Sequence, residues 1–127
     1  MNLMPISQYL EDNNFGIQAK NIFINQLPLE CPNGILLRNK LQGTHIDYEL
    51  PGYYKSHFKL TVRSDNYLKG NQQLNDVVTF LTLQEKQIDT MYFKFMRPTT
   101  LPTVFPISKG NLIEFTLDFE TAFIVPL

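Results

Sequence analysis

Three ionisable residues, His45, Asp47 and Glu49, are spaced by two in the segment THIDYEL. On a strand this spacing places all three side chains on one face, and His57 follows across the Pro51-Gly52 turn. Such a cluster of imidazole and carboxylate groups could bind a divalent metal and serve a small metal-dependent enzyme. A small non-catalytic binding module is a further alternative. A solvated strand face that ends in a turn explains the same residues. We favour that reading, because loosely spaced ligands of these types carry little specificity.

Cys31 is the one cysteine of the chain, and it could in principle pair with a histidine as a thiol–imidazole nucleophile. A lone cysteine beside Pro32 is more often a small packing residue. It cannot form an internal disulfide, which is compatible with a reducing compartment. The sequence contains no nucleophile elbow, P-loop, GxGxxG or paired CxxC motif. We therefore expect a protein that is not an enzyme and needs no cofactor or metal.

Lys55, Lys59 and Arg63 alternate along a predicted strand and share one of its faces. They could form a small basic patch, but the formal net charge of −1 and the pI of about 6.1 disfavour a nucleic-acid module. A solvated face is the simpler interpretation. The other possibility is that this basic stripe meets acidic residues at a subunit interface. The candidate acidic residues lie on the last predicted strand: Glu114, Asp118 and Glu120.

The residues from 53 to 83 predict the central elements that position these groups. Alternating Phe58, Leu60 and Val62 predict a strand with one buried face. Ser64-Asp65-Asn66 follows and can cap a helix. The buried face of that helix is predicted from the spacing of four apolar residues: Leu74, Val77, Val78 and Leu81.

The rest of the chain adds a short N-terminal helix and further strands. Gly16 is a candidate C-cap for that helix, and residues 21–26 and 35–38 read as strands that can pair as a hairpin. Residues 91–96 predict a strand with Met91, Phe93 and Phe95 on one face. The clearest alternation lies in residues 112–125, where one face carries Ile113, Phe115, Leu117 and Phe119.

This order of elements predicts an α+β fold, with a mostly antiparallel sheet and helices packed on one face. Hydrophobic residues make up 43% of the chain and charged residues 18%, a balance typical of a globular protein. The length of 127 residues suits a single domain over residues 1–127. No run approaches the roughly 20 apolar residues that a membrane helix needs, so we expect no membrane partner.

The segment from Arg97 to Lys109 is predicted to be a semi-rigid, proline-rich arm. Its prolines suit neither a helix interior nor a central strand. Its apolar residues need a partner, either the helix of their own domain or another subunit. We favour the subunit, because long structured loops tend to be functional. The apolar residues of the arm are Leu101, Val104, Phe105 and Ile107.

Several short motifs in this order resemble the tail-terminator and minor capsid proteins of tailed bacteriophages. The first is the turn LPGYYK at residues 50–55, followed by a strand and by the helix entry DNYLKG at residues 65–70. The loop RPTTLP at residues 97–102 and the closing strand LIEFTLDFE at residues 112–120 complete the set. The resemblance covers roughly residues 34–125 and rests on the order of the motifs.

The resemblance implies a virion structural protein that forms a ring, commonly of six subunits, at the head-proximal end of the tail. Such a ring stops tail-tube polymerisation and joins the tail to the head–neck complex. The implied partners are other copies of the chain, the tail tube protein and a head-completion or neck protein, with assembly in the host cytoplasm. Closed rings use heterologous interfaces, in which one surface meets a different one. The expected interface residues are Leu101, Val104 and Phe105, with Arg97, Arg63 and Glu114.

Overall fold

The structure is a computed structural model that describes residues 1–28, 30–41, 43–106 and 111–126. The helices are α1 (Met4–Asp12) and α2 (Tyr67–Leu81). The strands are β1 (Ile22–Ile24), β2 (Gly34–Asn39), β3 (His45–Ile46), β4 (Tyr53–Ser64), β5 (Leu83–Ile88), β6 (Met91–Pro98), β7 (Thr103–Pro106) and β8 (Ile113–Ile124).

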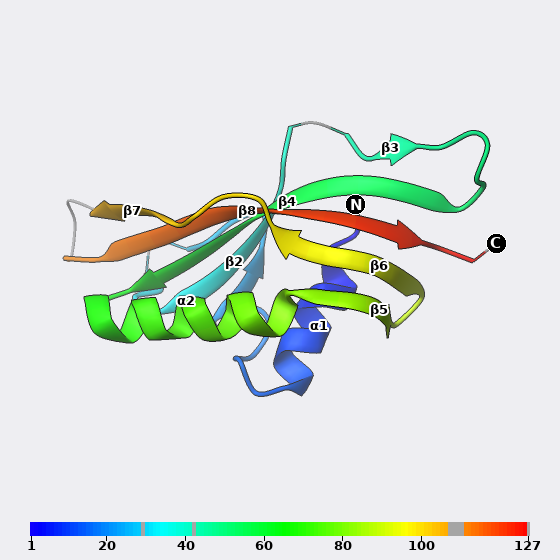
Figure 1. Cartoon of the computed structure of the whole chain (residues 1–127). Helices are drawn as coiled ribbons and strands as arrows, with labels where there is room; N and C mark the ends of the chain where they lie inside the picture. The colour runs from blue at the N-terminus through cyan, green and yellow to red at the C-terminus, as the bar shows by residue number, and fades with distance from the viewer. Residues whose placement is uncertain (29, 42, 107–110, 127) are drawn as a thin grey trace.

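One mostly antiparallel sheet holds these strands in the order β1-β2-β4-β8-β6-β5. Its centre is the pair β4 and β8, which are twelve residues each and are matched from Tyr53↔Ile124 to Ser64↔Ile113. β3 pairs with the outer part of β4, and β7 pairs with the start of β8. β7 and the β3–β4 turn therefore lie at opposite ends of the sheet (Figure 1).

Both helices lie against the same face of the sheet (Figure 1). Between the layers lies an aromatic core in which the rings of Phe58 and Phe119 stack at 5.1 Å. Tyr9 of α1 stacks on Phe80 of α2 at 4.5 Å, which joins the two helices. The predicted α+β class, with helices on one face of a mostly antiparallel sheet, is confirmed. So is the buried face of β4, because Phe58, Leu60 and Val62 are fully buried.

Helix α2 begins at Tyr67, where Asn66 Oδ1 accepts the backbone N–H of Lys69 at 3.0 Å. This is the cap that the sequence predicts. The buried face differs from the prediction by one residue, because Val78 is only half-buried at the edge of the core. Gly70 takes its place, since a Cβ there would lie 2.6 Å from Phe115 Cε2. The buried side of α2 consists of Gly70, Leu74, Val77 and Leu81.

The prediction that Met91, Phe93 and Phe95 share a face of β6 is wrong. The register with β8 shifts between Phe93, which faces Phe123, and Phe95, which faces Ala122. This β-bulge places one extra residue in β6, so the alternation of side chains restarts after it. Met96 is fully buried as a result, and Phe95 lies on the opposite face of the sheet.

The N-terminal region departs from two predictions. β1 and β2 pair in parallel, with Ile22 opposite Ile35, and do not form a hairpin. Asn25, with a positive φ of 67°, turns the chain just after β1. The chain then runs back along the sheet, so that β2 begins beside the first residue of β1 and runs in the same direction. Helix α1 ends at Asp12 with Asn13 as its C-cap, and Asn14 takes the left-handed conformation with φ 66°. Gly16 is therefore not the C-cap.

The segment predicted as the 97–109 arm contains two strand portions. β6 extends to Pro98, and β7 pairs with β8 through Val104 opposite Phe115 and Pro106 opposite Ile113. Proline is tolerated there because β7 lies at an edge of the sheet. β5 was not predicted, because its sequence LQEKQI is mostly polar and carries little alternation.

Candidate assembly surface

The arm carries its apolar side chains on the surface. Leu101 is 88% exposed, Phe105 50% and Val104 41%. Because Val104 and Phe105 are neighbours on a strand, they project from opposite faces of the sheet. Ile107, the fourth apolar residue of the predicted arm, lies outside the described residues. The arm therefore offers large apolar side chains that its own domain leaves uncovered.

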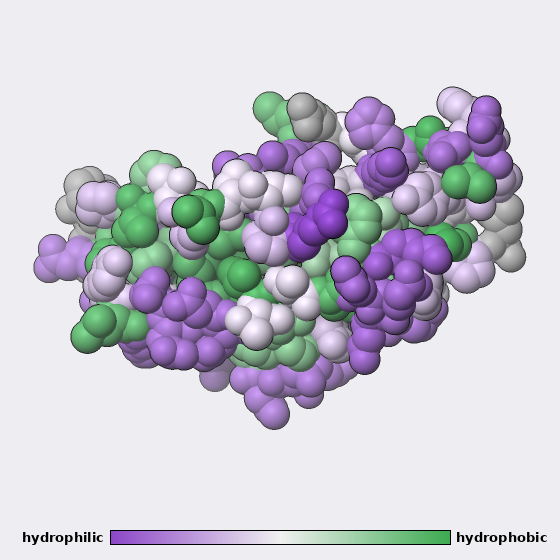
Figure 2. Space-filling view, in the orientation of Figure 1, coloured by the Kyte–Doolittle hydropathy of each residue, from purple (hydrophilic) through white to green (hydrophobic). Residues whose placement is uncertain are grey.

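The start of α2 extends this apolar surface. The Tyr67 ring lies 5.5 Å from the ring of Phe115, which is the β8 partner of Val104. Tyr67 is 52% exposed and Leu68 is 77% exposed. Apolar surface gathers over β7 and the N-terminal end of α2 (Figure 2). We refer to these exposed apolar side chains, which lie on both faces of the sheet around β7, as the arm patch: Tyr67, Leu68, Leu101, Val104 and Phe105.

Arg97 stands at the base of the arm on the sheet face that the helices leave open. Its Nε donates to Glu120 Oε1 at 2.5 Å, and its guanidinium lies 4.3 Å from the centre of the Phe95 ring. Further along, Thr99 N donates to Asp118 O at 2.8 Å. These contacts tie the base of the arm to β8, so the exposed residues beyond it stand on a fixed support.

The structure does not place His45, Asp47 and Glu49 on one strand face. β3 ends at Ile46, and Asp47 Oδ1 accepts the backbone N–H of Glu49 at 3.0 Å to form a turn. His57 faces Glu120 on β8. Within the described ranges, no three His, Cys, Asp or Glu residues are grouped to hold a metal ion.

Cys31 is half-buried in the connection between β1 and β2. Its thiol donates to the backbone carbonyl of Asn33 at 3.1 Å. Its own carbonyl accepts a hydrogen bond from Arg63 at 3.2 Å. The structure thus places this residue in a local packing and hydrogen-bonding role and does not bring it together with a histidine.

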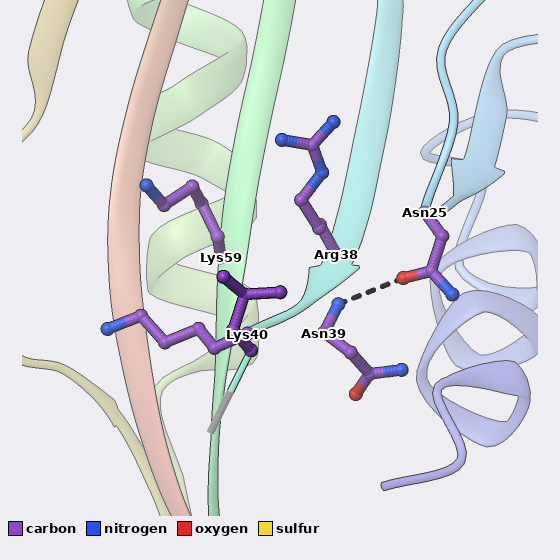
Figure 3. Close-up of a pocket in the computed structure, with 6 residues that line it drawn as sticks. Asn25, Arg38, Asn39, Lys40 and Lys59 are labelled. Carbon is purple, nitrogen blue, oxygen red and sulfur yellow. Dashed lines mark hydrogen bonds between the residues drawn. The ribbon is translucent and has the colours of Figure 1, made fainter. Parts of the chain in front are cut away.

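A hollow of about 740 Å³ opens where β2, β4 and the end of β1 meet (Figure 3). Arg38 and Lys59 are register partners on β2 and β4. Lys40 reaches across to β8, where its Nζ lies 3.3 Å from Asp118 Oδ2. Sequence analysis identified Lys59 but missed Arg38 and Lys40, because their proximity depends on a strand pairing that was not predicted. We refer to this site as the basic hollow: Asn25, Arg38, Asn39, Lys40, Leu41 and Lys59.

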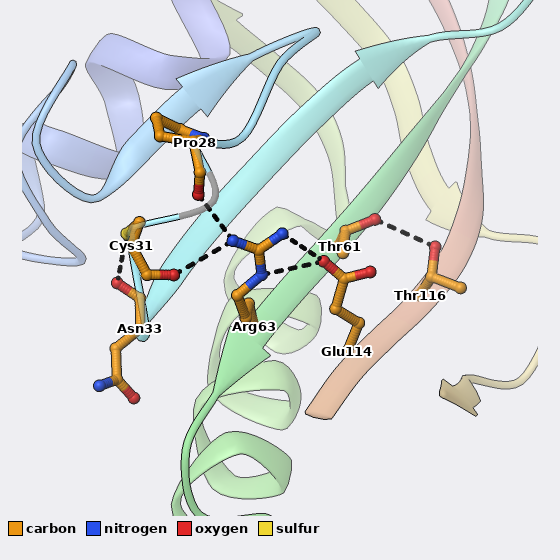
Figure 4. A network of polar contacts seen from close by, with 7 residues as sticks. All are labelled: Pro28, Cys31, Asn33, Thr61, Arg63, Glu114 and Thr116. Atoms are coloured by element: carbon orange, nitrogen blue, oxygen red, sulfur yellow. Dashed lines mark hydrogen bonds and ion pairs between the residues drawn. The ribbon is translucent and has the colours of Figure 1, made fainter. Parts of the chain in front are cut away.

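The predicted basic stripe of Lys55, Lys59 and Arg63 does share one face of β4, but Arg63 is buried and neutralised. Its Nη2 lies 2.9 Å from Glu114 Oε2. Its Nη1 donates to the carbonyls of Pro28 at 2.7 Å and Cys31 at 3.2 Å (Figure 4). The structure thus brings Arg63 and Glu114 together within one chain.

Comparisons with known proteins agree with this architecture. A family model described as bacteriophage tail terminator protein matches residues 9–123. A chain in the solved structure of the virion of a native gene transfer agent particle has a TM-score of 0.61 and 10% sequence identity. That match covers 81% of this chain and 78% of the other, and at this identity it shows a common fold alone. A comparison with curated proteins found no match. None of the described helices has the length and apolar character needed to cross a membrane.

Proposed function

The chain belongs to the bacteriophage tail terminator family, and on that premise we propose that it forms a ring at the head-proximal end of a phage tail. The chain is a structural protein of phage tails. In the proposal, a ring of six copies ends tail-tube polymerisation and joins the tail to the head–neck complex. Its partners are further copies of itself, the tail tube protein and a head-completion or neck protein, and assembly takes place in the host cytoplasm.

The observation that carries the ring proposal is the exposure of the arm patch. A monomer gains nothing from Leu101 at 88% exposure beside a half-exposed Phe105, whereas burial stabilises each large apolar side chain by about 1.5–3 kcal/mol. Large apolar and aromatic side chains also dominate interface energetics. We assign Leu101, Val104 and Phe105 as the anchors of the contact with the next subunit.

Charged residues on the open face of the sheet have a supporting part in this proposal. Arg97 is bound to Glu120, and Arg63 to Glu114, on the open face beside the arm. Phe105 is the register partner of Glu114, so the Arg63–Glu114 pair lies beside an anchor on the same face of the sheet. These residues would fix the register of the contact more than its strength.

Replacing two of the three anchors with serine tests the ring contact. Leu101→Ser with Phe105→Ser should leave the monomer folded, because both side chains are already exposed, and should abolish the oligomer. Light scattering coupled to size-exclusion chromatography measures the oligomer, and circular dichroism measures the fold. Ile17→Ser is the matched control, since Ile17 is 52% exposed but lies outside the arm. An oligomer that survives the double substitution would contradict the assignment of the arm.

A further inference from the structure

We propose that the β3–β4 turn of one copy docks in the basic hollow of the next copy. The turn consists of Asp47-Tyr48-Glu49-Leu50, and we refer to it as the acidic turn. The inference rests on the proposed ring, in which it names a second contact besides the arm patch. Each copy would offer its acidic turn to one neighbour and its basic hollow to the other, as a heterologous interface requires.

The basic hollow carries two cations that form no ion pair with any residue that the structure describes, although Asp118 is the Cα partner of Lys59 on β8. Arg38 and Lys59 are Cα partners on adjacent strands, and like charges directly opposite one another destabilise a sheet. The carboxylate on the next strand, Asp118, is bound to Lys40. Within the described ranges, neither Arg38 nor Lys59 forms an ion pair. An anionic group in the hollow would relieve this repulsion.

The acidic turn carries the complementary charges. Asp47 and Glu49 form no ion pair with any residue that the structure describes, and Glu49 is exposed. Asp47 accepts only a backbone N–H from within the turn. Two carboxylates within three residues match the two free cations of the basic hollow in number and sign.

The turn is held rigidly enough to act as a preformed ligand. Leu50 N donates to Asp47 O at 3.2 Å, which closes the acidic turn. The turn that follows it is closed by Tyr53 N, which donates to Leu50 O at 3.0 Å, and has Gly52 at a φ of +83°. Val125 N donates to Gly52 O at 2.8 Å, which ties this second turn to the chain just after β8. A preformed ligand loses little conformational entropy on docking.

Apolar exposure favours a protein partner over a nucleic acid. Tyr48 is 90% exposed and Leu50 is 54% exposed in the acidic turn, and Leu41 beside the hollow is fully exposed. A phosphate backbone would leave these side chains uncovered, whereas a second copy of the chain would bury them together with the ion pairs. The overall charge of −1 also disfavours a polyanion.

Charge reversal with a swap tests the contact. Arg38→Glu with Lys59→Glu makes the hollow acidic, and Asp47→Lys with Glu49→Lys makes the turn basic. Each variant alone then carries the same sign of charge on its turn and its hollow, so its copies should not dock with one another. In a mixture, the turn of each variant is opposite in charge to the hollow of the other, so the two variants can alternate around a ring. A zero-length carbodiimide joins a carboxylate to an amine in contact, and mixing isotopically light and heavy protein identifies crosslinks between copies by mass spectrometry.

We expect wild-type protein to give intermolecular crosslinks between the acidic turn and Lys59. Each reversed variant alone should lose them, and the mixture should restore them. The variant Arg38→Glu, which keeps the Lys59 amine available to the carbodiimide and is checked for folding by thermal melting, should also lose most of them. Crosslinks to Lys59 that persist undiminished in Arg38→Glu, or that are absent from concentrated wild-type protein or from the mixture, would overturn the proposal.

Two controls separate this inference from the ring proposal and from nucleic-acid binding. If the wild-type protein forms the oligomer without these crosslinks, the docking inference fails while the ring proposal stands. If Leu101→Ser with Phe105→Ser leaves the oligomer intact, the assignment of the arm fails independently. Binding of a labelled DNA duplex that depends on Arg38 and Lys59 would also overturn the docking proposal.

Discussion

Arg63 and Glu114 face each other across β4 and β8 as Cα partners, and two nitrogens of Arg63 bind one oxygen of Glu114 at 2.9 and 3.0 Å. The same guanidinium donates to two carbonyls of the connection between β1 and β2. A single buried side chain therefore joins three segments at the end of the sheet that carries the arm.

Removing Arg63 should destabilise the fold. Arg63→Met leaves Glu114, whose side chain is 26% exposed, without its partner and deprives two carbonyls of their donor. We expect the free energy of unfolding to fall by about 2–4 kcal/mol. This is at or below the usual cost of breaking a buried ion pair, because Glu114 stays partly exposed to solvent. Urea denaturation measures this change. A double-mutant cycle tests the coupling. Glu114→Gln should lower the free energy of unfolding less in the Arg63→Met background than in the wild-type protein. Strictly additive losses of stability would contradict the coupling.

Gly70→Ala should also destabilise the protein, although alanine favours helices over glycine by about 1 kcal/mol. The added Cβ would lie 2.6 Å from Phe115 and 2.7 Å from Ser64 Cβ. Overpacking of this kind typically costs about 1–3 kcal/mol. Asn75→Ala on the exposed side of α2 is the matched control and should be neutral or stabilising. Thermal melting compares the two, and a Gly70→Ala variant as stable as the control would show that α2 packs less closely on β8.

The protein should lose stability in acid partly through Glu11. Hydrogen bonds from the backbone N–H and side chain of Gln18 hold the pKa of the Glu11 carboxyl below its usual 4.5. The pKa of Glu11 is lower in the folded protein than in the unfolded chain, so the ionised carboxylate stabilises the folded state. This stabilisation is complete above pH 4.5 and is lost as the pH falls through the pKa of the folded protein. Glu11→Gln should flatten this part of the acid dependence of unfolding. An NMR titration in which Glu11 protonates at or above 4.5 would contradict this.

Much of the architecture follows from patterns that the sequence displays. The alternation in β4 and β8 and the cap and apolar face of α2 predict the sheet centre and its covering helix. The bulge in β6 is hidden because Phe95 is as apolar as the buried Met96, so the sequence does not reveal the change of face. β5 is hidden because a polar edge strand needs no buried face.

The site was predictable in part for similar reasons. Clustered apolar residues among prolines identify the arm, and its exposed side chains lie where they were expected to need a partner. The basic hollow was not predictable, because Arg38 and Lys59 meet only through the register of β2 with β4. The candidate metal ligands, which the sequence analysis did not favour, separate because Asp47 makes a turn with Glu49 in place of a continued strand.

The length of tail tubes tests the central claim most directly. Tail tube protein is polymerised alone, with the wild-type chain, and with the Leu101→Ser, Phe105→Ser variant, and the tube lengths are measured by electron microscopy. Wild-type protein should bind at one tube end and stop growth, whereas the variant should permit tubes of runaway length. Tubes that grow equally long with and without the wild-type protein would contradict the proposed role in ending the tail.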